Sequence, residues 1–172
     1  MPQEGKMSLH NLKDLYIDQL KDLYSAETQI VQALPKMVEK ATSDELRTAL
    51  ESHLNQTEGH VERLTQIFEE LNEQPMGKVC KGMKGLVAEG DETIGETEKT
   101  VRDAGIIASA QRIEHYEMAA YGTARNFAKL LGDDKAVSLL QQTLDEEGEA
   151  DKKLTKLADS SVNHQARQSA VA

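Results

Sequence analysis

Glutamates at helical spacing are the residues of this chain best suited to chemistry. Glu114 and Glu117 lie three apart in the segment IEHYEMAAYG, so on a helix they occupy neighbouring positions. Glu117 shares a stripe with the apolar Ile113, and Glu114 lies on the shoulder of that stripe. Burying an ionised carboxylate without a partner is expensive. An inward-facing pair therefore predicts a neutralising group inside the protein.

Two further predicted helices carry carboxylates on their apolar stripes. Glu27 lies in line with Leu20 and Leu34. Glu147 is central on its own stripe near Leu144, and Asp151 follows one turn later. At least three glutamates from three helices are thus predicted to converge on one interior.

The segment that precedes the long connection offers histidines as well as a carboxylate. Glu58 lies about a quarter-turn off the apolar stripe, which favours a solvated residue by roughly two to one. His53 and His60 lie closer to the stripe, although either one alone is more typical of a satisfied core histidine. In an antiparallel hairpin, residues equally far from the turn lie at the same height along the axis, so Glu27 is level with about residue 58. His60 is then within reach of Glu27, and His53 lies more than one helical turn away along the axis.

Converging carboxylates repel one another unless something neutralises them. A metal cation, a Lys or Arg side chain, or protonation of the carboxylates would each do so. The nearby bases Arg112, Arg125 and Lys129 fall mostly off the apolar stripe. A metal is the most economical of the three answers, and a donor set of carboxylate and imidazole suits iron or manganese.

Four long amphipathic helices must position these side chains. Apolar residues at three-and-four spacing predict helices over residues 9–41, 43–71, 104–131 and 134–158. Pro35 is expected to kink the first helix without ending it. Thr42 and Glu45 have the spacing of a capping box that opens the second helix. Gly132 predicts the turn between the last two helices.

The remaining segments read as connections. Residues 75–103 are rich in Gly and charge, which predicts a long connection with one or two short extra helices, and residues 159–172 read as a mobile polar tail. Two tight hairpins joined by a long crossover make an all-α, ferritin-like four-helix bundle. We therefore expect a single domain over residues 1–172, with the bundle at about 9–158.

Composition excludes several classes of function. The net charge of −10 and the pI near 5.0 argue against nucleic-acid or membrane binding through a basic face. Cys80 is the only cysteine, so an internal disulfide is impossible and a reducing cytoplasm fits. The N-terminal sequence lacks the pattern of a signal peptide, and no apolar run is long enough to cross a bilayer. The sequence thus predicts an acidic cytoplasmic protein.

Four segments resemble the helices of the YciE/YciF family, and its YciF branch in particular. They are SAETQIVQALPKM, SHLNQTEGHVERL, IEHYEMAAYGTA and LLQQTLDEEGEADKKL, within a resemblance that covers about residues 9–163. This family comprises ferritin-like, rubrerythrin-related bacterial stress proteins. The resemblance implies a homodimer and a di-metal centre of iron or manganese. It also implies that Glu27, Glu114, Glu117 and Glu147 are metal ligands.

The chain departs from the wider ferritin-like pattern at two positions. Di-iron proteins of that fold place a histidine three residues after a glutamate on the second and fourth helices. Here Val61 and Ala150 stand at those positions, after Glu58 and Glu147. His60, His53 or Asp151 are the candidate substitutes. A weakened site, a single-metal site and a site that has lost its metal all stay open.

Two functions follow from these residues. The first is a di-metal protein that reacts with oxygen or peroxide, as a detoxifying oxidase would. The second is a non-catalytic dimeric stress protein that acts through partners and keeps a vestigial or empty site. The inward glutamates favour the first, and the missing histidines favour the second.

Overall fold

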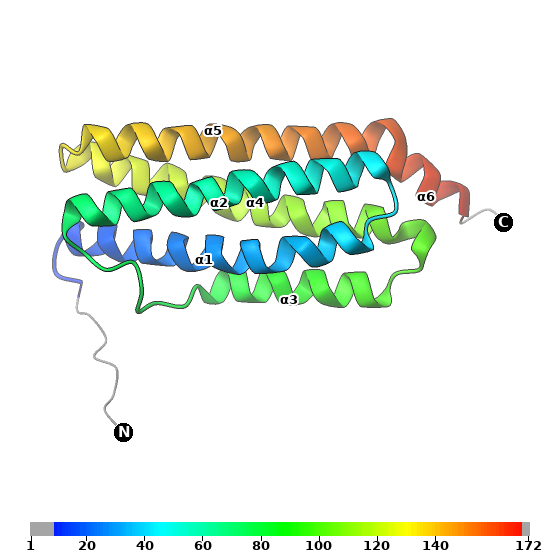
Figure 1. Cartoon of the computed structure of the whole chain (residues 1–172), viewed down its shortest axis with the longest axis horizontal. Coiled ribbons are helices and arrows are strands. Elements are labelled where there is room, and N and C mark those ends of the chain that lie inside the picture. Colours follow the sequence, from blue (N-terminus) through cyan, green and yellow to red (C-terminus); the bar gives the residue numbers. More distant parts are fainter. Residues whose placement is uncertain (1–8, 170–172) are drawn as a thin grey trace, which may run out of the picture.

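The computed structural model describes residues 9–169, and every regular element within that range is helical (Figure 1). The elements in chain order are α1 (Leu12–Lys40), α2 (Asp44–Leu71), α3 (Lys81–Glu96), α4 (Lys99–Leu130), α5 (Asp134–Leu157), the π-helical turn η1 (Ala158–Val162) and α6 (Asn163–Ser169). The all-α prediction is confirmed. Within the described range no helix is long and apolar enough to cross a membrane.

Four long helices form an antiparallel bundle. α1 packs against α2 and α4, and α5 packs against α2 and α4, so each of the four long helices contacts two of the other three. The connection between the two hairpins runs the length of the bundle and contains α3, which lies along α1 and α4 (Figure 1). The predicted bundle with one long crossover and an extra helix is therefore confirmed.

The hairpin turns are fixed by local chemistry. Gly132 adopts a positive φ of 77° between α4 and α5, a conformation that glycine reaches without steric cost. Asp133 then caps α5 by accepting a hydrogen bond from the backbone N–H of Ala136. At the first turn Ser43 caps α2, not Thr42 as the capping-box spacing predicts.

Asp103 explains the shift of that cap by one residue. Its carboxylate accepts hydrogen bonds from the backbone N–H groups of Thr42 and Ser43 and from the Thr42 hydroxyl, at 2.7–2.8 Å. The Thr42 side chain is thereby turned towards α4, which leaves the Ser43 hydroxyl to accept from the N–H of Leu46. The same contacts fasten the α1–α2 turn to the beginning of α4.

Two segments are more ordered than the sequence indicated. α4 begins at Lys99, five residues before its predicted start at residue 104, and α3 occupies 16 residues of the predicted connection. The expected polar tail is helical through η1 and α6, because the buried Ala158 and Val162 join the apolar core at that end of the bundle. Residues 170–172 of that predicted tail lie outside the described residues.

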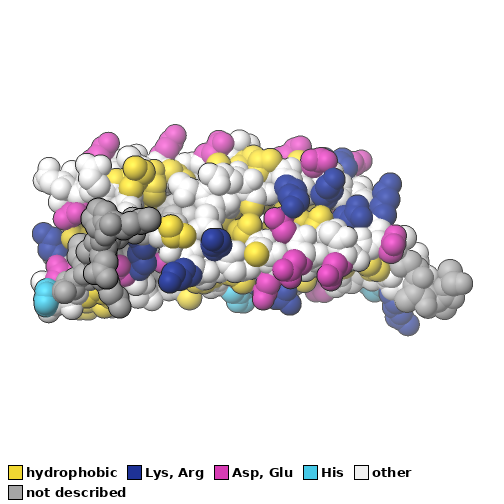
Figure 2. Space-filling model, turned by 90° about the horizontal axis from the view of Figure 1, so that it is seen from below, with side chains coloured by type: hydrophobic (Ala, Val, Ile, Leu, Met, Phe, Trp, Pro, Cys, Tyr) yellow, Lys and Arg dark blue, Asp and Glu magenta, His cyan; other side chains and the backbone are white. Residues whose placement is uncertain are grey.

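The apolar core is divided into two clusters by a polar layer. Along α1, Leu23 belongs to one cluster and Ile30 to the other, with Glu27 between them. Along α5, Leu140 and Leu154 flank Glu147 in the same way. On the outer face seen in Figure 2, acidic and basic side chains are interspersed. The fold thus places its buried charges at the middle of the bundle.

Candidate metal centre

Six ionisable side chains from the four long helices meet in this polar layer. They are Glu27 of α1, His53 and His60 of α2, Glu114 and Glu117 of α4, and Glu147 of α5. Each is at most 8% exposed, and Glu27, His60, Glu117 and Glu147 are 0% exposed. The amphipathic patterns of the helices bring them together, because each lies on a stripe whose apolar members form the core on either side. We call these six residues the carboxylate cluster.

The carboxylate cluster contains two overlapping sets of donor atoms. One set is His53, Glu114, Glu117 and Glu147, and the other is Glu27, His60 and Glu147; within each set the donor atoms lie within 4.8 Å of one another. Glu147 belongs to both. Its Oε1 lies 3.0 Å from His60 Nδ1, and its Oε2 lies 3.7 Å from His53 Nε2. One carboxylate therefore turns an oxygen towards each histidine, as a bridging ligand would.

Most of the donor atoms in the cluster have no hydrogen-bond partner among the described residues. Both oxygens of Glu117 and of Glu147 lack one, as do His53 Nε2 and His60 Nδ1. Close approaches nevertheless exist, such as the 3.2 Å between His53 Nε2 and Glu114 Oε1 and the 3.3 Å between His60 Nδ1 and Glu27 Oε1. Two ligands about 2.1 Å from one ion and at right angles to each other are about 3.0 Å apart. The separations in the carboxylate cluster are thus compatible with atoms that share one ion.

No Lys or Arg side chain of the described residues pairs with the four buried glutamates. Arg63 pairs instead with Glu146, because its guanidinium donates to both Glu146 oxygens at 2.8 and 2.9 Å. Glu146 in turn accepts at 2.9 Å from His60 Nε2. The bases considered from sequence lie elsewhere; Arg125, for example, pairs with Gln141. Neutralisation by Lys or Arg is therefore not how this structure resolves its buried carboxylates.

Two residues outside the carboxylate cluster orient its members. Tyr121 donates a short hydrogen bond to Glu27 Oε1 and is itself fully buried. Glu146 fixes His60, because an ionised carboxylate can only accept and so requires the proton on Nε2. When the His60 imidazole is neutral, its Nδ1 lone pair therefore faces Glu27 and Glu147. Such supporting contacts are the usual companions of metal ligands.

Without a metal, burial and like charge hold protons in the carboxylate cluster. Burial and the charges of Glu147, Glu27 and Glu114 raise the pKa of Glu117 well above its ordinary value. Burial also raises the pKa of Glu114, to about 8, against the opposing effect of His53. The pKa of Glu27 is raised for the same reason, against the effect of His60.

The pKa values of the two histidines and of two acidic groups, Glu147 and Glu146, depend on the charges of their neighbours. Burial lowers the pKa of a histidine, but the carboxylates around His53 and His60 outweigh it and raise these pKa values to about 9 and about 10. Burial would raise the pKa of Glu147, but the two imidazoles lower it below its ordinary value. Against the effect of burial, Arg63 lowers the pKa of Glu146 to about 2.

The predicted site residues divide into those that meet and those that do not. Glu27, Glu114, Glu117, Glu147 and His60 lie together as expected. His53 also belongs to the carboxylate cluster, but it stands in the set of donor atoms that does not contain Glu27. Its predicted distance of more than one turn from the level of Glu27 agrees with that division. The cluster extends along the bundle axis, and its His53–Glu114 part lies beyond the level of Glu27 that was used for that prediction.

Two less certain candidates lie outside the cluster. Glu58 is exposed, as its place on the helical wheel favoured. Asp151 is partly buried but faces the surface of α4, where it contacts His115 at 3.3 Å and Gln111 at 3.0 Å. Neither residue joins the carboxylate cluster.

Sequence reasoning missed the supporting residues Tyr121, Glu146 and Arg63. The role of Glu146 was not predicted, because the helical wheel places Glu147 at the centre of the apolar stripe and Glu146 only at its edge. Arg63 follows His60 by one helical turn, a spacing that could have suggested a shared partner. Tyr121 follows Glu117 by one helical turn, a spacing that could have indicated a place beside the carboxylates.

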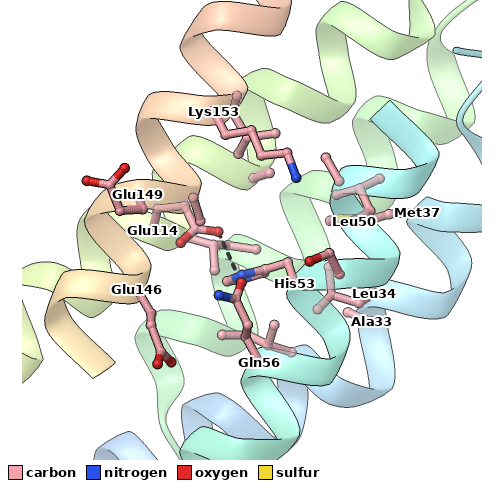
Figure 3. A pocket seen from close by; sticks show the side chains of 17 residues that line it. Ala33, Leu34, Met37, Leu50, His53, Gln56, Glu114, Glu146, Glu149 and Lys153 are labelled. Atoms are coloured by element: carbon pink, nitrogen blue, oxygen red, sulfur yellow. Dashed lines mark ion pairs between the residues drawn. The ribbon is translucent and has the colours of Figure 1, made fainter. Parts of the chain in front are cut away.

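A cavity of about 140 Å³ opens beside the carboxylate cluster (Figure 3). It lies between α1, α2, α4 and α5 and is lined mainly by apolar side chains. His53 and Glu114, joined by the dashed line in Figure 3, form part of its wall. The cluster is therefore reachable from this side.

Comparisons with known proteins agree over nearly the whole chain. A family described as a domain of unknown function (DUF892) matches residues 11–167. Protein YciF of Escherichia coli (strain K12) is 43% identical over 166 residues, which cover 95% of this chain and 100% of that protein.

Solved structures match as closely. The crystal structure of the Escherichia coli stress protein YciF has a TM-score of 0.86 and 44% identity, covering 90% of this chain and 99% of that chain. YcfI from Rhodopseudomonas palustris, described as a candidate structural protein, has a TM-score of 0.84 and 46% identity, covering 87% and 96%. A protein from Xanthomonas campestris pv. campestris, at 18% identity, 93% and 99% coverage and a TM-score of 0.75, shares the fold.

Proposed function

The chain belongs to the DUF892 family, and from that premise we propose that it is a stress-associated protein whose bundle holds a dinuclear centre of iron or manganese. The identity to YciF supports the resemblance to the YciE/YciF family and the association with stress. One observation carries the metal centre: Glu147 is fully buried and turns one oxygen towards His53 and the other towards His60.

The donor atoms fit two divalent ions. His53, Glu114 and Glu117 would hold one ion and Glu27 and His60 the other, with Glu147 shared between them. Four carboxylates carry four negative charges, which two divalent cations balance while both imidazoles stay neutral. The buried charge that is so costly in the metal-free cluster is thereby removed. Carboxylate and imidazole ligands suit iron and manganese.

Ions bound there would supply redox chemistry towards oxygen or peroxide. The residues of the chain have separate tasks around that chemistry. Tyr121 orients Glu27, and Glu146 keeps the proton of His60 on Nε2 so that Nδ1 faces the site. The two apolar clusters above and below the polar layer exclude bulk water from it. His53 and Glu114 face the cavity through which a small molecule would reach the centre.

Elemental analysis of protein purified without chelators tests this proposal. We expect about two iron or manganese ions per chain in the wild type, by analogy with di-metal bundles. Glu27→Ala removes a ligand and should lose at least one ion. Glu58→Ala is the matched control, because Glu58 is an exposed glutamate outside the carboxylate cluster. Metal-free wild-type protein with an intact helical fold would contradict the proposal.

A second candidate is a non-catalytic stress protein that acts through its assembly or a partner. The description of YcfI as a candidate structural protein favours it, as does the absence of the ExxH histidines at Val61 and Ala150. Glu27→Ala with Glu117→Ala separates the two functions. Loss of protection against oxidative stress in cells, with the fold and assembly unchanged, supports the redox function. Unaltered protection supports the second candidate.

We also propose that the protein forms a homodimer, as the family resemblance implies. Exposed apolar side chains such as Met76, Val79 and Leu130 offer surface for such contacts. Light scattering should then give twice the chain mass of 19.0 kDa. A single chain mass, or a large cage-like species, would exclude the dimer.

A further inference from the structure

The cavity beside the carboxylate cluster has the size and lining of a small-molecule site. Its volume is about 140 Å³. An apolar cavity of about 150 Å³ in another protein stays dry and binds benzene. Ile30, Leu34, Leu50 and Ile113 supply apolar walls of the same kind here. A single six-membered carbon ring therefore fits the available space.

The cavity meets the cluster on one side only. His53 is 8% exposed and Glu114 is 2% exposed, and both line the cavity. Glu27, His60, Glu117 and Glu147 are 0% exposed and do not line it. The two halves of the carboxylate cluster are thus unequal, and a molecule in the cavity contacts only the His53–Glu114 half.

Charges around the cavity disfavour an ionic ligand. Glu146 is engaged by Arg63, and Glu149 by Lys152 at 2.7 Å. Lys153 reaches over the cavity from α5 in Figure 3 and is exposed to solvent, where its charge is well hydrated. Ser52 and Gln56 add uncharged polar groups to the lining. The buried His53 and Glu114 already face each other, with Nε2 and Oε1 3.2 Å apart, so neither is left as a counterion for a charged ligand.

We propose that this cavity binds a small neutral apolar molecule, about the size of an aromatic ring and carrying at most one hydrogen-bonding group that faces His53 and Glu114. The apolar walls hold the ring, and the polar end lies beside the proposed metal position. Binding itself requires only the cavity. The role of the molecule as a substrate of the centre rests on the proposed function.

Calorimetric titration with phenol tests the proposal, on metal-free protein and on protein loaded with manganese. We expect saturable binding of one phenol per chain in both forms. Ala33→Leu places a larger side chain into the cavity from α1 and should weaken binding at least tenfold. Ala120→Leu is the matched control, since Ala120 is also a half-buried alanine on a long helix but packs against the other apolar cluster. It should bind as the wild type does.

Three results would overturn the assignment. They are absence of phenol binding, equal binding by wild type and Ala33→Leu, and binding of benzoate at least tenfold tighter than phenol. If Ala33→Leu fails to fold, Ser52→Trp at the exposed rim replaces it and should slow phenol association in a stopped-flow measurement, whereas an unchanged rate would count against binding through this cavity.

Metal analysis of the same samples separates the two proposals. Protein that binds phenol but no metal keeps the cavity site and loses the dinuclear centre. Protein that binds metal but no phenol would support the dinuclear centre and exclude the proposed ligand of the cavity.

Discussion

At the scale of single residues, the polar layer is defined by buried carboxylates whose oxygens lack hydrogen-bond partners among the described residues. Glu117 is fully buried with both oxygens unbonded among the described residues, and Glu147 is placed between two histidines. The supporting contacts of Tyr121 and Glu146 point ligand atoms inwards. A buried group of this kind is stable only when protonated or bound to a cation. Under the proposed function the centre therefore has two states, one that holds protons and one that holds metal.

Removal of the Tyr121 hydroxyl should weaken one metal position. Tyr121→Phe deletes the hydrogen bond to Glu27, and loss of such a contact typically lowers metal affinity about 10- to 100-fold. Competition with a chromophoric chelator measures the affinity of each position. Tyr116→Phe is the control, because the Tyr116 hydroxyl donates to Asp22, away from the carboxylate cluster. Equal metal affinities in the two variants would contradict the assigned role of Tyr121.

The stability of the metal-free protein should fall as pH rises. The pKa of Glu114 is raised from 4.5 to about 8, that of His53 from 6.5 to about 9 and that of His60 from 6.5 to about 10. Each group binds its proton more tightly in the folded protein. Its contribution is therefore complete below the unfolded pKa and is lost as pH rises through the folded pKa. Glu146 and Glu147, whose pKa values are lowered, act oppositely and lose their contribution only as pH falls below 4.5.

Urea denaturation between about pH 5 and pH 9 measures this dependence. We expect a monotonic loss of unfolding free energy in metal-free protein over that range. Metal binding displaces the same protons, so metal affinity should rise with pH. A metal-free protein that becomes more stable towards pH 9 would show that these groups are not protonated in the fold.

At the scale of helices, most of the architecture could be predicted from sequence. Apolar periodicity places Glu27 and Glu147 on inward stripes because the same stripes build the core. Pairing from the hairpin turn gives only the level of Glu27, so the extension of the cluster along the bundle axis to His53 could not be predicted from it. The helix over residues 158–169 was missed because its burial rests on few apolar residues, Ala158 and Val162 among them. Asp103 was missed because its partners lie about 60 residues away.

Asp103 should contribute measurably to stability through that long-range contact. Asp103→Ala removes three hydrogen bonds to a buried carboxylate, and we expect a loss of about 2–3 kcal/mol in unfolding free energy. Chemical denaturation measures the difference. Glu98→Ala is a matched control, since Glu98 stands at the N-cap of α4 without a side-chain capping bond and should change stability by less than about 0.5 kcal/mol. Equal losses would contradict the tie between α4 and the α1–α2 turn.

At the scale of the whole molecule, the bundle is two apolar clusters joined by a polar middle layer. Such a layer weakens a core unless its charges are balanced. Two divalent cations would balance the four glutamates and turn the weakest layer into a cross-link between all four long helices. The adjacent cavity gives one half of that layer a route to small molecules. The helix packing, the buried charges and the cavity thus all meet at the carboxylate cluster.

Anomalous scattering from crystals grown with iron or manganese would locate the ions of the proposed dinuclear centre. We expect two peaks about 3.5–4 Å apart, the spacing of known two-metal sites. One peak should lie between His53 and Glu114, the other between Glu27 and His60, with Glu147 bridging them. Crystals of metal-loaded protein with no peak in the polar layer, or with peaks only at surface carboxylates, would contradict it.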